Sequence, residues 1–336
     1  MFNTICIVGA GAIGGWMGAR LAASGCEISY LARGATLAAL QTQGLRLRET
    51  VDDQPRESTH AVRASDDPAQ LAAPGAPDLV IIALKAPALP EVAPRLGPLL
   101  GPHTAVLTAM NGVPWWFLHG MSGTLAGRTL NAVDPGGVIG RALAAERVIG
   151  GVVHASCSVD APGVIRRRAG NELIVGEPSG AATPRLRALA DLLRRAGFET
   201  TVSRQIQADI WYKLWGNMTV NPACMLTGVT ADKLLADELA RGFLSAVMLE
   251  ARDIGARLGI PIAGSVEERH AITRSLGALK PSMLQDVQAG KPVELDALVT
   301  VVCELGQLAG AATPFTDALL GLARVYARDK GLYPKE

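Results

Sequence analysis

The stretch that decides the fold is "TICIVGAGAIGG", residues 4–15. A short run rich in β-branched residues leads directly into Gly9, and a helical pattern follows Gly14. A strand, a glycine-rich turn and a helix in this order are typical of a dinucleotide-binding unit. In such a unit, the first glycine makes the tight turn, Gly11 lets the backbone approach a pyrophosphate, and Gly14 lets helix and strand pack closely.

This glycine loop is the predicted phosphate site. The start of a helix offers unpaired N–H groups and a favourable dipole to an anion. The alternative is that the glycines serve only a tight turn. The residues predicted to bind the cofactor here are Gly9, Ala10, Gly11, Ala12, Ile13 and Gly14.

The end of the second strand indicates which dinucleotide is bound. Residues 26–31, "CEISYL", are followed by Arg33, and no acidic residue stands where an NAD site would hold the ribose 2′-hydroxyl. A guanidinium binds a phosphate in bidentate fashion, so Arg33 favours the 2′-phosphate of NADP. An exposed surface arginine is the competing interpretation.

Composition excludes several function classes. The 336 residues are 49% hydrophobic and 19% charged, with a formal net charge of +1, so nothing favours nucleic acid or an anionic membrane. No apolar run approaches the roughly 18 residues that span a bilayer. We expect no leader peptide, since the glycine loop follows so soon after residue 4. Five scattered cysteines without a CxxC pair suit a reduced cytoplasmic protein without metal.

The first part of the chain reads as an α/β domain. Continuous apolar runs at 78–84 and 104–110 are typical of parallel strands buried on both faces. From 148 to 178 the pattern changes to segments separated by turn residues, which predicts antiparallel strands. A helix over about 184–196 and a last strand, "FETTV", complete this part. We predict strands at 148–159, 163–169 and 171–177.

Strands stop after about residue 204, so the remainder is predicted to be helical. The expected division is an NADP-binding Rossmann-like domain over 1–203 and a helical substrate domain over 204–336. Prolines and glycines are expected to end the helices, for example at Asn221-Pro222. The predicted helices cover 206–220, 232–258, 265–277, 282–289, 294–309 and 314–328.

Polar residues stand where a cleft is expected. Lys85 and Asn111 each follow a predicted buried strand, and ligands bind beyond the carboxyl ends of such strands. In "DIWYKLWGNMTVN", residues 209–221, helical steps of four place Lys213, Asn217 and Asn221 nearly on one face, about 6 Å apart along the axis. This polar stripe is either a solvated face or the lining of a site.

Taken together, these motifs resemble the ketopantoate reductase (2-dehydropantoate 2-reductase) family over nearly the whole chain. The resemblance rests on "GAGAIGG", "ALKA", "MNG", "WYKLWGNMTVNP" and "SMLQDVQAGKPVELD". It implies a Rossmann-like NADP-binding domain followed by a helical domain like the C-terminal domain of 6-phosphogluconate dehydrogenase. The implied activity is NADPH-dependent reduction of 2-dehydropantoate to pantoate, towards pantothenate and coenzyme A.

The resemblance also implies roles for particular residues. Lys213 would be the general acid, and Glu294 would reach the cofactor ribose or the substrate from the second domain. Lys85 would lie beside the nicotinamide ribose, and Asn111 would touch both cofactor and substrate. The remaining substrate-binding residues would be Asn217, Asn221 and Ser282.

The chemistry fits a lysine at position 213 independently of the resemblance. Hydride delivery to a ketone leaves negative charge on oxygen, which an ammonium ion can both stabilise and protonate. Arginine cannot give up a proton, and only 7 of the 32 basic residues are lysine. We expect Trp211, Tyr212 and Trp215 to limit water there, which lowers the pKa of the lysine. A snorkelling surface lysine is the alternative.

One departure from the family pattern leaves the substrate open. Pro114, Trp115 and Trp116 follow Asn111-Gly112 where the family has small residues. The tryptophans could belong to the core, to an oligomer contact, or to the border of the cleft, where they would reshape it for a different 2-oxo acid. A non-catalytic dinucleotide sensor is a further alternative, but it does not explain the stripe at Lys213. A small-molecule 2-oxo acid is the expected partner, and a homodimer is left open.

Overall fold

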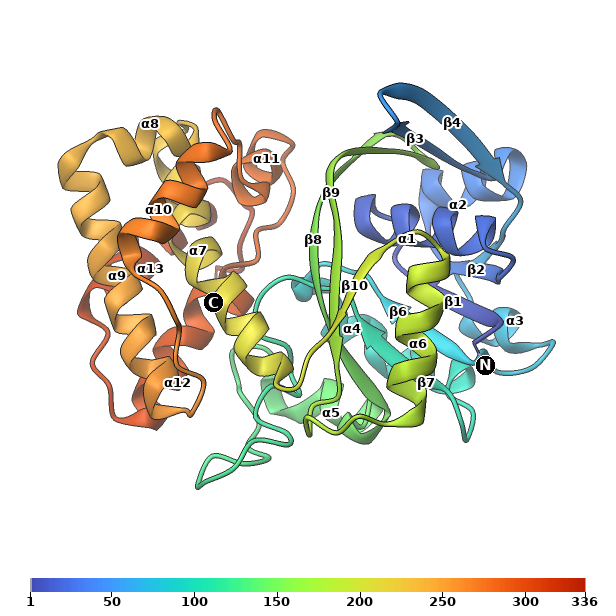
Figure 1. Ribbon diagram of the computed structural model, residues 1–336, viewed down its shortest axis with the longest axis horizontal. Coiled ribbons are helices and arrows are strands. Elements are labelled where there is room, and N and C mark those ends of the chain that lie inside the picture. The colour runs from blue at the N-terminus through green and yellow to red at the C-terminus, as the bar shows by residue number, and fades with distance from the viewer. Residues whose placement is uncertain (1, 336) are drawn as a thin grey trace. The chain divides into compact units, whose positions relative to one another are not determined.

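A computed structural model describes residues 2–335, which form two compact units (Figure 1). The first unit runs to Met110 and also includes residues 116–127 and 137–206. The second contains residues 111–115, 128–136 and the chain from Gln207 onward. Compactness therefore groups Asn111 with the helical part of the chain, although it follows a strand of the first unit. The division at 203/204 stays a prediction.

The first unit is built on one ten-stranded mixed sheet. The strand order is β4-β3-β9-β8-β7-β6-β1-β2-β5, and β10 pairs with β9. The strands are β1 (Thr4–Val8), β2 (Glu27–Leu31), β3 (Leu45–Val51), β4 (Gln54–His60), β5 (Arg63–Ser65), β6 (Leu79–Ile82), β7 (Ala105–Thr108), β8 (Val148–Ala161), β9 (Val164–Gly176) and β10 (Glu199–Val202).

The parallel centre of this sheet follows from its apolar runs. Strands β6 and β7 are buried at every position, and both are parallel to their neighbours, as the sequence predicts. Helix α1 contacts β3, β8 and β9, and Trp16 on α1 packs edge-on against Phe198 with ring centroids 4.9 Å apart. The same core includes Tyr30 of β2, whose hydroxyl donates to the Gly14 carbonyl at 3.0 Å.

Two features of the sheet differ from the prediction. The antiparallel hairpin of β3 and β4 is absent from the prediction because β4 is almost entirely polar and exposed. The segments 163–169 and 171–177 were expected as two strands, but they form the single strand β9, which pairs with β8 along its whole length (Figure 1). Irregular register near His154 and Gly170 absorbs the turn-like residues there.

The helices of the first unit are short, apart from those that pack on the sheet. Helix α6 lies beside β10 (Figure 1), and its N-cap Thr183 accepts a bond from the Leu186 N–H. The helices are α1 (Ala12–Ala23), α2 (Gly34–Gln43), α3 (Pro68–Ala72), η1 (Ala86–Ala88), α4 (Leu89–Val92), η2 (Ala93–Leu99), η3 (Pro135–Gly137, of which only Gly137 belongs to the first unit), α5 (Val138–Ala142), η4 (Ala145–Arg147) and α6 (Pro184–Arg195).

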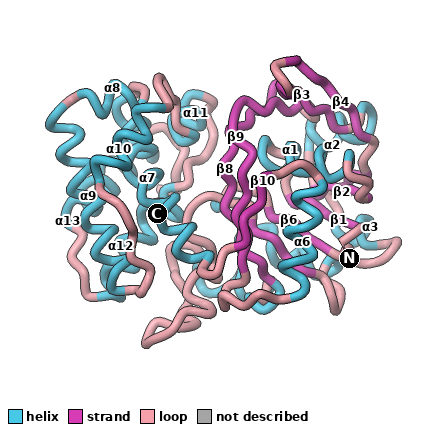
Figure 2. Tube along the Cα trace, viewed as in Figure 1, coloured by secondary structure: helices cyan, strands magenta, loops and turns pink. Residues whose placement is uncertain are grey.

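The described part of the second unit contains helices and loops only (Figure 2). Within residues 2–335, no helix combines the length and the apolar character needed to cross a bilayer. The helices are α7 (Ile206–Thr227), α8 (Ala231–Ala236), α9 (Glu238–Arg257), α10 (Val266–Ser275), α11 (Ser282–Gln288), η5 (Asp296–Thr300), α12 (Val301–Ala309) and α13 (Pro314–Asp329).

Three helix boundaries differ from the prediction. Helix α7 does not end before Pro222 but continues to Thr227, because burial of Ala223 and Cys224 in a local core outweighs the lost backbone bond. The predicted helix over 232–258 is two helices, since Asp237 caps the start of α9. The stretch expected as one helix over 294–309 begins with η5, a π-helical turn.

Candidate active site

Lys213 lies on α7, and two tryptophans fix how this helix sits on α9. The indole N–H groups of Trp211 and Trp215 donate to the carbonyls of Ala251 and Met248 at 3.1 and 2.7 Å. Both indoles are buried, whereas Tyr212 is 37% exposed. The two indoles therefore anchor α7 on α9 and fix its orientation within the second unit.

The ammonium group of Lys213 donates to Oδ1 of Asn111 at 2.8 Å. Burial lowers the pKa of Lys213 to about 8, while the negative charge of Glu294 acts in the opposite direction. Glu294 is itself only 6% exposed. Three of the predicted site residues thus interact within the second unit: the half-buried ammonium of Lys213 is bonded to the amide of Asn111, and the negative charge of Glu294 acts on it. This is the arrangement expected of a proton donor whose pKa lies near neutral pH.

Asn111 is held in place by a contact that the sequence gives no means of predicting. The backbone N–H of Val113 donates to the carbonyl of Ala297 at 2.9 Å, and Ala297 belongs to the π-helical turn η5. Gly112 has φ +82°, and a Cβ there would lie 2.3 Å from the same carbonyl oxygen. A glycine is therefore required beside Asn111, and the turn after Glu294 locates the asparagine that Lys213 binds.

The two asparagines further along α7 have amides that are available to a ligand. Asn221 is 5% exposed and Asn217 is half-buried. Neither side chain hydrogen-bonds to another of residues 2–335. Amides that are mostly shielded from solvent and keep their hydrogen-bonding capacity can bind a ligand, so this pair favours the lining of a site over a solvated face. Ser282 is exposed at the first position of α11, and no contact brings its hydroxyl to Lys213.

The glycine loop in the first unit has the geometry that a dinucleotide requires. Gly9 has φ +104° and donates its N–H to the Leu31 carbonyl, which joins the loop to β2. A Cβ at Gly14 would lie 2.1 Å from the Gly9 carbonyl oxygen, whereas a Cβ at Gly11 would meet nothing within 4 Å. Gly11 therefore opens onto space at the start of α1, where no side chain caps the helix.

Arg33 and Lys85 also belong to the first unit, after the two strands that flank β1 in the sheet. Arg33 follows β2 and is exposed, and its guanidinium has no ion pair or hydrogen bond with the rest of residues 2–335. Lys85 follows β6 and is half-buried. The segment just before Lys85 contacts the loop, since a Cβ at Gly9 would lie 2.9 Å from the Ala83 carbonyl oxygen. These residues thus border the carboxyl edge of the sheet.

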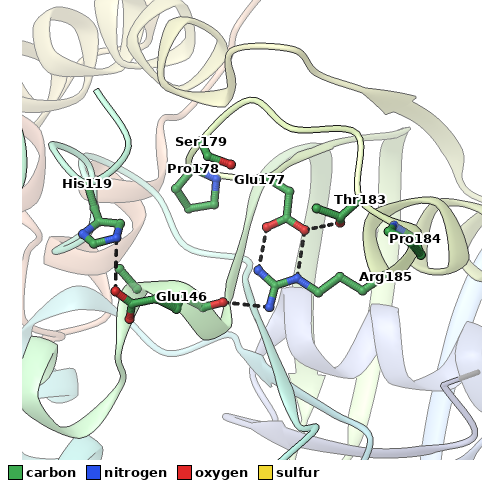
Figure 3. A pocket seen from close by; sticks show the side chains of 9 residues that line it. His119, Glu146, Glu177, Pro178, Ser179, Thr183, Pro184 and Arg185 are labelled. Atoms are coloured by element: carbon green, nitrogen blue, oxygen red, sulfur yellow. Dashed lines mark hydrogen bonds and ion pairs between the residues drawn. The ribbon is translucent and has the colours of Figure 1, made fainter. Parts of the chain in front are cut away.

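A separate pocket of about 520 Å³ in the first unit contains none of the predicted site residues (Figure 3). Its buried carboxylate, Glu177, accepts two bonds from the Arg185 guanidinium at 2.6 and 2.8 Å and one from the Thr183 hydroxyl at 2.5 Å. Figure 3 shows the guanidinium also reaching the Glu146 carbonyl, while Glu146 pairs with His119 at 3.4 Å. The buried charge is balanced within the protein, so this pocket does not call for a charged ligand.

The two tryptophans after Asn111-Gly112 are both buried. Trp115 is 6% exposed and Trp116 is 2% exposed. The ring of Trp116 fills the space beside Gly150, where a Cβ would lie 2.5 Å from the indole. Trp116 therefore belongs to the interior of the first unit, and the position of Trp115 at the border of the cleft stays a prediction.

Comparisons with known proteins point to a single family. The sequence model described as "Ketopantoate reductase PanE/ApbA" matches residues 5–180, and the one described as its "C terminal" matches residues 205–327. The Mesorhizobium japonicum protein named 2-dehydropantoate 2-reductase is 46% identical over 98% of this chain and 99% of its own length.

Solved structures agree with the sequence matches. A crystal structure of a candidate ketopantoate reductase from Ralstonia solanacearum MolK2 has a TM-score of 0.93 and 53% identity, and covers 99% of this chain and 100% of that one. A dimeric ketopantoate reductase from Staphylococcus aureus has a TM-score of 0.74 and 18% identity, covering 98% of this chain and 100% of that one. The second likeness concerns the fold alone.

Proposed function

The chain belongs to the ketopantoate reductase family, and we propose that it reduces 2-dehydropantoate to pantoate with NADPH, a step towards pantothenate and coenzyme A. The observation that carries the proposal is the Lys213 ammonium held at 2.8 Å by Asn111 and attracted by the buried Glu294. A ketone needs a proton donor of this kind when it is reduced.

Each residue of the second unit then has a chemical task. NADPH, when bound, supplies a hydride to the ketone carbon. Lys213 stabilises the negative charge that develops on the oxygen and gives it a proton. Asn111 orients the ammonium, and Glu294 keeps its pKa from falling further. The amides of Asn217 and Asn221, with the hydroxyl of Ser282, bind the polar groups of the substrate.

The first unit is assigned to the cofactor. The backbone of the Gly9–Gly14 loop and the start of α1 would hold the pyrophosphate, since Gly11 leaves that approach open. The unpaired guanidinium of Arg33 would bind the 2′-phosphate that distinguishes NADPH from NADH. Lys85 and Asn111 would lie at the nicotinamide end, and Glu294 would contact the ribose or the substrate.

Steady-state oxidation of NADPH with a panel of 2-oxo acids tests the proposal. The panel contains 2-dehydropantoate, shorter and longer aliphatic 2-oxo acids, and an aromatic one. We expect kcat/KM to be highest for 2-dehydropantoate. A higher kcat/KM for another member would identify that acid as the substrate, while the proposed hydride transfer and proton donation would stand. Tight NADPH binding without turnover on any member would support the dinucleotide sensor instead.

The family relationship and the surface of α13 support a homodimer. Phe315, Leu322 and Val325 are 46, 63 and 69% exposed on this helix. Exposed apolar side chains gathered on one helix often mark a contact between subunits. Light scattering should give twice the mass of one chain, and Leu322→Glu should give a monomer. A wild-type monomer at micromolar concentration would refute the assembly.

A cytoplasmic location is proposed from the cysteines. The five cysteines are all free, and Cys6, Cys224 and Cys303 are buried. A reducing compartment leaves such thiols unpaired. Fractionation of the native cell, with the protein followed by antibody, tests the location, and recovery in a secreted or membrane fraction would contradict it.

A further inference from the structure

The C-terminal end of the chain contacts the segment that contains Glu294 at two points. The backbone N–H of Val293 donates to the carbonyl of Leu332 at 3.1 Å. The hydroxyl of Tyr333 donates to Oδ1 of Asp296 at 2.5 Å. The residue before Glu294 and the residue two places after it are therefore both bonded to adjacent residues of the tail.

The tail is itself firmly placed on α13. Leu332 is buried, and its N–H donates to the Ala327 carbonyl at 2.8 Å. The Arg328 side chain donates from Nε to the Pro334 carbonyl at 2.9 Å, and its guanidinium lies 5.7 Å from the centre of the Tyr333 ring. The tyrosine hydroxyl thus comes from an ordered element rather than from a loose end.

The other side of this segment leads to Asn111 and Lys213. Asp296 opens the π-helical turn η5, and Thr300 also donates to its Oδ1 at 2.9 Å. The next residue, Ala297, accepts the bond from Val113 that locates Asn111. Turns of this kind are frequent at functional sites, because they shift a few residues out of the regular helical register. Along the chain, Asp296 therefore stands between Glu294 and Ala297, whose carbonyl accepts the bond that locates Asn111.

We propose that Tyr333 is a positioning residue for the reaction: through Asp296 it holds the 294–297 segment, and with it Glu294 and Asn111, in place around Lys213. The inference rests on the proposed function. Tyr333 touches neither substrate nor cofactor in this account. Its contribution is the geometry of the groups that set the charge and direction of the Lys213 ammonium.

The hydroxyl of Tyr333 keeps its proton over the working range of the enzyme. Burial and the bond to Asp296 raise the pKa of Tyr333 to about 12, although Thr300 and Arg324 act in the opposite direction. A tyrosine that stays protonated donates to the carboxylate at every pH where Lys213 titrates. The hydrogen bond between Tyr333 and Asp296 therefore persists over this pH range and does not act as a pH switch.

The test compares Tyr333→Phe with Tyr326→Phe, a matched loss of one hydroxyl from α13. Tyr333→Phe should lower kcat on the order of tenfold, because small displacements of catalytic groups are costly. NADPH affinity should change less than kcat does, since the glycine loop and Arg33 belong to the first unit and only the contacts at the nicotinamide end would be displaced. The alkaline limb of the rate profile should also move to lower pH, because a displaced Glu294 raises the pKa of Lys213 less. Tyr326→Phe should match wild type in all three.

A double-mutant cycle shows whether Tyr333 acts through Asp296. The effects of Tyr333→Phe and Asp296→Ala on kcat should be strongly non-additive, and both proteins should melt cooperatively. Additive effects, or a Tyr333→Phe enzyme with the kcat and pH profile of wild type, would overturn the inference and leave the proposed function intact. A wild-type protein that reduces no 2-oxo acid would overturn the proposed function, and this inference with it.

Discussion

The lowered pKa of Lys213 predicts how turnover depends on pH. Lys213 must be protonated to act as the donor, and burial lowers its pKa from 10.5 to about 8. This fall corresponds to about 3 kcal/mol against the charged form. The ammonium fraction is then about nine-tenths at pH 7 and about one-tenth at pH 9, so turnover should fall about tenfold between them.

Replacing Glu294 by glutamine should shift the decrease in turnover to lower pH. The carboxylate raises the pKa of Lys213, so its removal lowers that pKa and shifts the alkaline limb to lower pH. A shift of about one pH unit is the usual size for a nearby opposite charge. At pH 8 the protonated fraction would then drop from about a half to about one-tenth.

The assay is kcat for NADPH oxidation at saturating 2-oxo acid from pH 6 to 10, for wild type and Glu294→Gln. Glu238→Gln serves as the control, because Glu238 is exposed at the start of α9. Its alkaline limb should coincide with that of wild type. An unchanged limb in Glu294→Gln, or a wild-type rate that stays flat to pH 10, would refute this account of Lys213.

The remaining predictions concern the two binding regions. Gly11→Ala should keep the melting temperature of wild type, because its Cβ meets open space, but weaken NADPH binding, because that space is the approach of the pyrophosphate. Gly14→Ala should destabilise the protein on the order of 2 kcal/mol, because its Cβ meets the Gly9 carbonyl. Equal melting temperatures in thermal denaturation would contradict this. Arg33→Ala should weaken NADPH binding far more than NADH binding in fluorescence titrations, and equal losses would show that Arg33 does not bind the 2′-phosphate. Asn217→Ala and Asn221→Ala should each raise KM for the oxo acid about five- to tenfold with NADPH affinity nearly unchanged; a fall in NADPH affinity would place the amides at the cofactor.

Local signals made much of the fold predictable. The strand, glycine loop and helix at residues 4–23 follow from sequence spacing, and the buried parallel strands follow from continuous apolar runs. The hairpin over 45–60 escaped prediction because its second strand is polar and offers no alternation to detect. Helix α7 passes through Pro222 because tertiary burial outweighs a local breaker, which sequence patterns do not measure.

The candidate site was predictable to a similar extent. Helical periodicity groups Lys213, Asn217 and Asn221, and the family resemblance adds Asn111 and Glu294. The approach of Asn111 to Lys213 depends on the bond between Val113 and Ala297, which are far apart in the chain. The support from Tyr333 depends on where the last helix ends and on a π-helical turn that no pattern marked. Such long-range contacts arise only when the helices pack.

The central claim is that Lys213 protonates a ketone that NADPH reduces, and a single-turnover experiment tests it most directly. The enzyme is mixed with 2-dehydropantoate and NADPH that has deuterium at both C4 positions, and the product is analysed by mass spectrometry. Wild type should give pantoate containing one deuterium. Lys213→Ala should bind NADPH normally and form product on the order of 10² to 10⁴ times more slowly, and Lys213→Arg should recover little of the rate. Labelled pantoate formed by Lys213→Ala at the wild-type rate would contradict the account.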